Sequence, residues 1–211
     1  MSDDPKTRAA RAFSSKAVST GSTRDRILEA AISVIERDGA ERATVRAIAA
    51  EAGVNLAAIN YHYRSKEDLM EAAIASTWSH ATEDLLKFLE VEPADIGRGV
   101  EALILYLLKG GKTYPNVTRA HLLGAGSSGA YEVVLEGQRR FVEESARVVT
   151  KALGVPFDDD AVTRTSALYF FCLYSAIVPG SLPAAVSAGG FGPCAALLAG
   201  DYIACLRRAA C

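Results

Sequence analysis

Three residues in the segment 44–63, TVRAIAAEAGVNLAAINYHY, have the types and spacing that hold two helices at a sharp angle. Ala49 is small enough for the helices to cross closely, and Gly53 can adopt the positive φ that a sharp turn requires. Ile59 fills the angle between the helices. This is the helix-turn-helix arrangement, whose second helix enters the major groove of DNA, so the expected chemistry is recognition of base edges and phosphates.

The flanking sequence predicts the helices that position this turn. A first helix is predicted from Thr23 to Gly39, with Ser22 and Asp25 as a capping-box pair and apolar residues at helical spacing: Ile27, Leu28, Ala31, Val34 and Ile35. Thr44 is predicted to cap a short helix, and residues 55–61 form the next one. Ser65 caps a long helix that continues to about residue 90.

The remaining chain also has the periodicity of helices. They are expected at about 97–110, 116–126, 130–153, 158–178 and 192–209, and no segment shows the sustained alternation of a strand. The sequence therefore predicts an all-α fold. We divide it into a flexible basic arm (1–22), a helix-turn-helix DNA-binding domain (23–68) and a helical effector-binding and dimerisation domain (69–211).

Residues 23–70 resemble the DNA-binding domain of the tetracycline-repressor (TetR) family. The matching motifs are ILEAA, the helical T-V-R-x-I-A, AGV, and Y-H-Y followed by S-K-E-D-L. The resemblance implies an all-helical homodimer in which a small ligand in the C-terminal domain changes the spacing of the two reading heads. Residues 71–211 carry no motif that we can match.

The resemblance also implies which residues contact DNA: Thr44, Arg46, Asn55, Leu56, Ala57, Asn60, Tyr61, His62 and Lys66. Thr44 and Lys66 match phosphate contacts, and Tyr61 with His62 matches a backbone-clamping pair. Arg46 and Asn60 could pair with guanine and adenine, respectively, and Ala57 permits close approach.

The sequence departs from the family pattern at Asn60, where an aromatic residue is common, and at Tyr63, where Phe is common.

Several of these residues could have a structural role instead of a DNA contact. Tyr61 and Tyr63 could be core aromatics, with the core favoured for Tyr63. His62 and Arg46 could be solvated surface residues, Leu56 could serve packing alone, and the arm could be an inert tail rather than a DNA contact.

The charge is distributed unevenly along the chain. The net charge is −2, with 23 Lys+Arg against 25 Asp+Glu. Taken over the whole chain, this balance argues against nucleic-acid binding, because proteins that bind nucleic acids are often basic. Residues 1–64, however, hold 10 basic and 8 acidic side chains, and residues 65–211 hold 13 and 17. The region that would contact DNA is therefore mildly basic.

Other residues with possible chemistry form no catalytic or metal-binding pattern. The four cysteines lie in the last quarter without a C-x-x-C pair, so we expect no metal or cofactor, and free thiols in a reducing cytoplasm. A redox role for Cys172 or Cys205 is an alternative that no neighbouring basic residue supports. The G-x-G-x-x-G at residues 124–129 lacks the strand that a dinucleotide site needs, so we expect a break between helices and no enzyme.

Residues 165–200 contain no charged side chain. The apolar part, residues 167–178, is too short to span a membrane, so we expect buried helices and a subunit interface. A mostly apolar effector pocket is predicted from residues with apolar bodies and a few polar tips: Trp78, Leu85, Leu103, Tyr106, Leu107, His121, Phe141, Tyr169, Phe170, Leu173 and Tyr174. Each of these could instead be a core residue.

We therefore predict a ligand-responsive transcriptional repressor that binds a palindromic DNA operator as a homodimer and is released by a small, mostly apolar effector. Two alternatives remain. One is an enzyme that uses the Gly-rich loop or the C-terminal thiols. The other is a DNA-binding dimer without a ligand, which would act as a constitutive architectural or nucleoid-occlusion regulator.

Overall fold

The computed structural model describes residues 22–123, 128–178 and 191–209, and within these ranges every regular element is a helix. The elements are α2 (Thr23–Asp38), α3 (Val45–Ala52), α4 (Leu56–His62), α5 (Lys66–Lys87), the 3-10 helix η1 (Pro93–Asp95), α6 (Ile96–Thr113), α7 (Pro115–Leu123), α8 (Ser128–Leu153), α9 (Asp159–Ile177) and α11 (Phe191–Ala209). The predicted all-α fold is confirmed. The predicted arm, except Ser22, and residues 124–127 of the Gly-rich motif lie outside the described residues.

Local sequence signals set the ends of the first helix. The Ser22 hydroxyl accepts a hydrogen bond from the Asp25 N–H at 3.3 Å, and the Asp25 carboxylate accepts one from the Ser22 N–H at 3.0 Å. Gly39 ends α2 with a φ of +84°. The capping box and the glycine stop are both as predicted, because each depends only on residues within a turn of one another.

The described residues form two compact units. The N-terminal unit comprises residues 22–81, 114–123 and 128–137, and the C-terminal unit comprises residues 82–113, 138–178 and 191–209. These limits differ from the division at residues 68 and 69 drawn from the motif, because α7 and the first part of α8 belong to the same unit as the helix-turn-helix.

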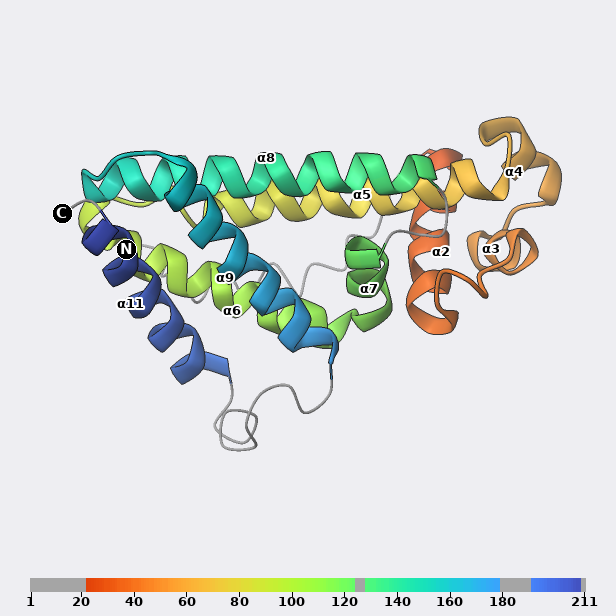
Figure 1. Cartoon of the computed structure of the whole chain (residues 1–211). Helices are drawn as coiled ribbons and strands as arrows, with labels where there is room; N and C mark the ends of the chain where they lie inside the picture. Colours follow the sequence, from red (N-terminus) through yellow and green to blue (C-terminus); the bar gives the residue numbers. More distant parts are fainter. Residues whose placement is uncertain (1–21, 124–127, 179–190, 210–211) are drawn as a thin grey trace. The chain divides into compact units, whose positions relative to one another are not determined.

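The N-terminal unit is built around one apolar core. Figure 1 shows α3 and α4 joined by a short turn, with α2 beside α3. Buried aliphatic side chains of this core come from five helices: Ile27, Val34, Ile35, Ile48, Ile59, Leu69, Ile74 and Val117. A distant segment closes the core, since α7 packs on α2 and the Glu36 carboxylate accepts a hydrogen bond from the Val117 N–H at 3.0 Å.

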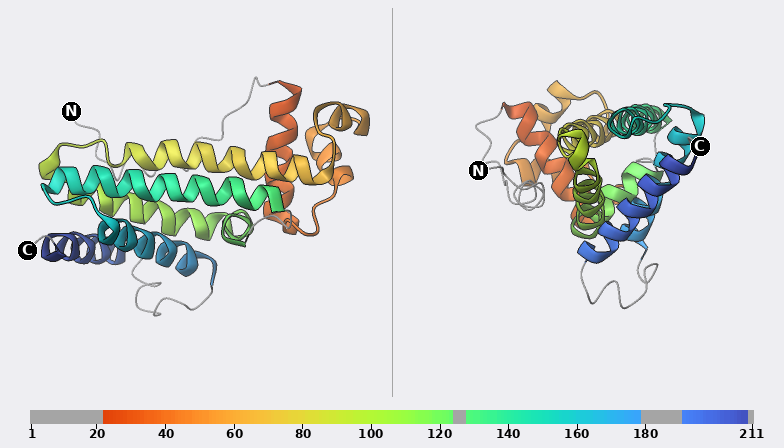
Figure 2. Two further views of the ribbon diagram at one scale, coloured as in Figure 1. Left: turned by 45° about the horizontal axis from the view of Figure 1, so that its top comes forward. Right: turned by 90° about the vertical axis from the view of Figure 1, so that its left-hand side faces the viewer.

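The C-terminal unit centres on α6, which packs against α9 and α11. Figure 2 shows α9 and α11 side by side. Ile104 and Leu108 of α6 are fully buried, as is Phe141 of α8. None of the helices in the described ranges combines the length and the apolar character needed to cross a bilayer.

Candidate nucleic-acid interface

The turn between α3 and α4 has the geometry of a helix-turn-helix. The Thr44 side chain caps α3 by accepting a hydrogen bond from the Ala47 N–H at 3.1 Å. Gly53 has a φ of +64°, in the left-handed region where a side chain would be strained. Ala49 is 5% exposed and Ile59 is 2% exposed, so the small residue and the filling residue lie where the spacing predicts.

Arg26 of α2 fixes the same turn from outside the motif. Its Nη2 donates a hydrogen bond of 2.7 Å to the carbonyl of Ala52, one of the acceptors left open at the end of α3. The sequence interpretation gave Arg26 no role, because its partner lies 26 residues away. We class Arg26 as a positioning residue.

Helix α4 presents a solvent-exposed face beside its buried Ile59. Leu56, Ala57, Asn60 and Tyr61 are exposed, and their i, i+1, i+4 and i+5 spacing places them together on one side of the helix. The preceding residue, Asn55, caps α4 by accepting a hydrogen bond from the Ala58 N–H at 2.8 Å. Its side-chain carbonyl is thus engaged in the cap, whereas the amide NH₂ is the group that could face DNA.

The three aromatic residues at the end of α4 have different environments. Tyr61 is 85% exposed, which rules out the core alternative for this residue. Tyr63 is 7% exposed and packs in the apolar core, as favoured from the sequence. His62 is half-buried, and its ring contacts Tyr61 edge to face with centroids 5.1 Å apart. Tyr61 therefore faces outward, His62 lies partly covered beside it, and Tyr63 anchors the helix.

The charged candidates lie at helix starts. Arg46, in the first turn of α3, is exposed. Lys66 is the first residue of α5, which Ser65 caps by accepting a hydrogen bond from the Asp68 N–H at 3.0 Å. The Lys66 Nζ lies 3.4 Å from the Glu41 carbonyl, a long contact that an approaching phosphate could displace. Thr44, Arg46 and Lys66 thus combine hydroxyl, guanidinium and ammonium donors near helix N-termini, which favour anions.

Comparison with known proteins agrees with this geometry. The model of the family described as bacterial regulatory proteins, tetR family, matches residues 27–73. The nicotine-responsive transcriptional repressor HdnoR of Paenarthrobacter nicotinovorans is 47% identical over 58 residues, which are 28% of this chain and 30% of that protein. Residues 27–73 of this chain are therefore a DNA-binding region of the TetR type. The matching family consists of bacterial regulatory proteins.

Two further relatives extend the TetR comparison. The transcriptional regulator TtgW of Pseudomonas putida is 33% identical over 86 residues, 41% of this chain and 60% of that protein. The matched segments thus span less than two thirds of HdnoR and of TtgW. A crystal structure from Mesorhizobium loti, assigned to the TetR family, has a TM-score of 0.70 and 17% identity, covering 94% of this chain and 98% of that one. That structure shares the TetR fold across both units.

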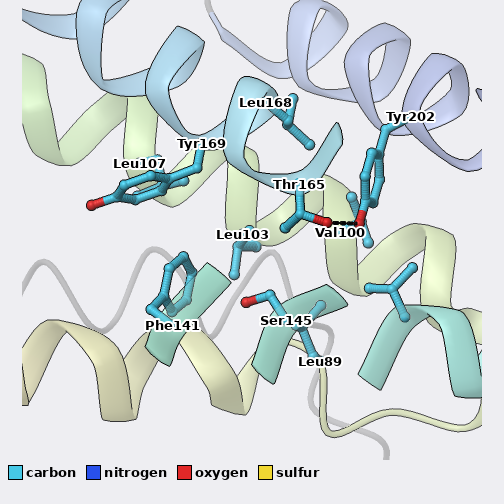
Figure 3. Close-up of a pocket in the computed structure, with 11 residues that line it drawn as sticks. Leu89, Val100, Leu103, Leu107, Phe141, Ser145, Thr165, Leu168, Tyr169 and Tyr202 are labelled. Carbon is cyan, nitrogen blue, oxygen red and sulfur yellow. Dashed lines mark hydrogen bonds between the residues drawn. The ribbon is translucent and has the colours of Figure 1, made fainter. Parts of the chain in front are cut away.

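The C-terminal unit contains a small, almost wholly apolar cavity (Figure 3). Its volume is about 20 Å³, room for roughly one water-sized group. Residues from α6, α8, α9 and α11 line it together with Leu89: Val100, Leu103, Leu107, Phe141, Ser145, Val149, Thr165, Leu168, Tyr169 and Tyr202.

Four of the residues expected to form the effector pocket line this cavity: Leu103, Leu107, Phe141 and Tyr169. The others lie elsewhere. Leu173 is buried away from the cavity, and the Tyr106 ring packs on Phe88. Phe170 and Tyr174 are 43% and 56% exposed on α9. The side chains of Trp78 and Leu85 lie outside the described residues, and His121 belongs to the N-terminal unit.

His121 is held against α5 within the N-terminal unit. The Thr77 hydroxyl donates to the Ile74 carbonyl at 2.8 Å, so its oxygen accepts from the His121 Nε2–H, also at 2.8 Å. Burial lowers the pKa of His121 from 6.5 to about 4, and a hydrogen bond to the Ile74 backbone offsets part of this effect. The imidazole is therefore neutral at pH 7 and serves as a donor.

Acidification is expected to destabilise the chain through His121. Between pH 6.5 and about 4 the unfolded state binds this proton more readily than the folded state. The contribution is complete above pH 6.5, falls as the pH drops, and amounts to at most about 3 kcal/mol. Urea unfolding across this pH range should show a shallower pH dependence for His121→Asn than for the parent. Parallel profiles would contradict the prediction.

The structure agrees with the sequence expectation for Cys172 and differs from it for Cys205. Cys172 is fully buried, and burial raises its pKa to about 12, so its thiol has a packing role. Cys205 is half-buried, and the Arg208 Nη2 lies 3.2 Å from its Sγ. The expectation that no basic residue neighbours these thiols was therefore wrong for Cys205, because residues 205 and 208 lie one helical turn apart.

Proposed function

We propose that this regulator is a ligand-responsive repressor that binds a palindromic operator as a homodimer and releases it when a small, mostly apolar effector occupies the C-terminal unit. The observation that carries the proposal is the exposed face of α4, with Leu56, Ala57, Asn60 and Tyr61 directed away from the core. A face of this kind beside a left-handed glycine turn is the part of a helix-turn-helix that enters the major groove.

Repression is favoured over activation by one relative. HdnoR is a nicotine-responsive transcriptional repressor, and its 47% identity covers 58 residues of this chain. The similarity supports the direction of regulation and the presence of an effector. It does not extend to nicotine as the effector, because the match covers only 28% of this chain.

An aromatic surface on α9 supports the homodimer. Phe170, Phe171 and Tyr174 are 42–56% exposed, and Leu197 of α11 is 65% exposed. These residues belong to the stretch 165–200, which has no charged side chain. Large exposed apolar residues in an uncharged surface are typical of subunit interfaces, and a two-fold dimer would present two copies of α4 to successive major grooves.

The proposed response is a shift between dimer conformations. An effector that binds one conformation more tightly moves the population toward it, and the two α4 helices then no longer match successive grooves. The apolar cavity among α6, α8, α9 and α11 is the candidate place for the effector. Its volume of about 20 Å³ also favours a second candidate, a constitutive DNA-binding regulator without a ligand. Effector-dependent release of DNA would distinguish the two.

Charged substitutions in the aromatic surface should separate the subunits. We expect Phe170→Glu/Tyr174→Glu to sediment as a monomer and to bind the DNA upstream of its own gene about tenfold or more weakly, because burying two carboxylates per chain opposes association. Analytical ultracentrifugation and fluorescence anisotropy with that DNA measure both effects. The parent should bind as two chains per palindrome.

Tyr114→Glu is the matched control, since Tyr114 is also a partly exposed aromatic (44%) but lies in the N-terminal unit. It should remain dimeric. A dimeric Phe170→Glu/Tyr174→Glu variant would remove this surface from the proposal, and a parent chain that binds no specific DNA would overturn the proposed function itself.

A further inference from the structure

Ser145 of α8 is a buried polar residue in an otherwise apolar environment. It is 4% exposed, and its Oγ has no hydrogen-bond partner among the described residues. Ser145 lines the cavity of the C-terminal unit, and Figure 3 shows its hydroxyl directed into the space beside Phe141 and Leu103. A buried hydroxyl without a partner costs about 1–3 kcal/mol, so an alanine would be more stable here unless something binds the hydroxyl.

Two buried threonines of the same unit donate their hydroxyl hydrogens to the preceding turn of their own helices. Thr150 donates to the Ala146 carbonyl at 2.8 Å, and Thr165 donates to the Ala161 carbonyl at 2.8 Å. This bond to the preceding turn is the usual solution for a buried Ser or Thr in a helix. Ser145 does not use it, so both its donor and its acceptor remain available to the cavity.

Two other polar groups of the cavity wall, the hydroxyls of Thr165 and Tyr202, are bonded to each other. The hydrogen of Thr165 is used on Ala161, so in the 2.6 Å contact with Tyr202 the tyrosine hydroxyl is the donor. Tyr202 therefore has no hydrogen left for a ligand. Among the lining residues there is no Asp, Glu, Lys, Arg or His.

The cavity of the C-terminal unit is unfavourable for ionised groups. Burial raises the pKa of Tyr202 to about 12 and that of Tyr169 well above its ordinary value, so both phenols are neutral. The same desolvation would act on an ionised ligand group, and no cationic side chain in the wall would compensate it.

We propose that Ser145 is the polar anchor of the effector and that the effector carries a neutral hydrogen-bonding head, such as an amide or an alcohol, on an aliphatic body. Anionic head groups are excluded from this cavity. This inference rests on the proposed function, because it names the chemical class of the ligand at the same site.

The size of the cavity adds a condition. A volume of about 20 Å³ accommodates the head group alone, so the aliphatic body must displace the flexible side chains of Leu103, Leu107 and Leu168. These leucines belong to α6 and α9, which pack against each other. Ligand binding is thereby coupled to the packing of these two helices.

Octanamide and octanoate form a matched probe pair, since they have similar shape and differ in charge. Octanamide should raise the Tm of the full-length protein in a saturable manner at neutral pH, and octanoate should not. Octanoate should begin to bind as the pH falls toward the pKa of its carboxyl group. Ser145→Ala should weaken octanamide binding about tenfold, the value of one buried hydrogen bond.

Ser166→Ala is the control, because the Ser166 hydroxyl donates to the Val162 carbonyl at 2.9 Å and does not line the cavity. It should bind octanamide like the parent. The unliganded Ser145→Ala variant should have a Tm no lower than that of the parent. This result would show that its weaker binding of octanamide is not caused by a folding defect.

Three results would overturn the inference: octanoate binding as tightly as octanamide at neutral pH, full octanamide affinity in Ser145→Ala, or no saturable binding of octanamide. In the last case Ser145 holds only a buried water. The proposed function fails separately, when the parent protein binds no operator or when no ligand of any class releases it.

Discussion

A variant carrying Tyr61→Ala and Lys66→Ala is expected to bind operator DNA about 1,000-fold more weakly than the parent, since each of the two lost phosphate contacts is worth about 1 kcal/mol in each of the two half-sites. Tyr61 is 85% exposed and Lys66 begins α5, so neither side chain is needed by the core. The loss should be similar for specific and non-specific DNA, because phosphate contacts carry no sequence information.

The salt dependence distinguishes lost phosphate contacts from other defects. Each lysine removed from a phosphate should reduce the slope of log K against log salt by roughly 0.9. Fluorescence anisotropy at several salt concentrations measures this slope. Lys109→Ala/Tyr114→Ala, which also removes an exposed lysine and an exposed aromatic, should retain both the affinity and the slope. Parent-like DNA binding by the Tyr61/Lys66 variant would show that these residues were wrongly placed in the interface.

Truncating Ile59 should destabilise the N-terminal unit rather than remove a direct contact with DNA. Ile59 is 2% exposed in the core of the N-terminal unit, so Ile59→Ala is expected to lower the free energy of unfolding by about 2–5 kcal/mol. The angle between α3 and α4 depends on this side chain, so DNA affinity should fall for specific and non-specific sequences alike. Urea denaturation followed by circular dichroism measures the stability.

Leu56→Ala is the matched control on the same helix. Leu56 is 42% exposed, so its truncation should change the free energy of unfolding by no more than about 0.5 kcal/mol. A selective loss of operator affinity in Leu56→Ala would identify it as a DNA contact rather than a packing residue. An Ile59→Ala variant as stable as Leu56→Ala would contradict the packing of the turn described above.

The parts of the fold that could be predicted depend on residues close together in the chain. The Ser22–Asp25 capping box, the Thr44 cap and the Gly53 turn each involve side chains within one or two helical turns, so their spacing contains the necessary information. The burial of Tyr63 follows in the same way from the apolar period of its neighbours.

The rest depends on contacts between distant segments. His121 was grouped with the pocket on its residue type, yet its partner Thr77 lies 44 residues away in the N-terminal unit. Phe170 and Tyr174 have the composition of pocket residues but face outward, since composition does not fix the rotation of a helix. Ser145 was not selected, because a single serine in a helix has no sequence signal that separates it from a surface residue.

The contribution of α7 and α8 to the core of the N-terminal unit affects the order in which the protein can be made. Val117 and Val134 lie in the same buried cluster as Ile27 and Ile59, and Glu36 binds the start of α7. A ribosome that has completed residues 22–81 has therefore not yet supplied the side chains that cover this core. Domains generally fold as units during synthesis. The N-terminal unit can therefore complete its folding only after residue 134 has left the exit tunnel of the ribosome. By then most of the C-terminal unit has also been synthesised, so both units become available for folding at nearly the same time.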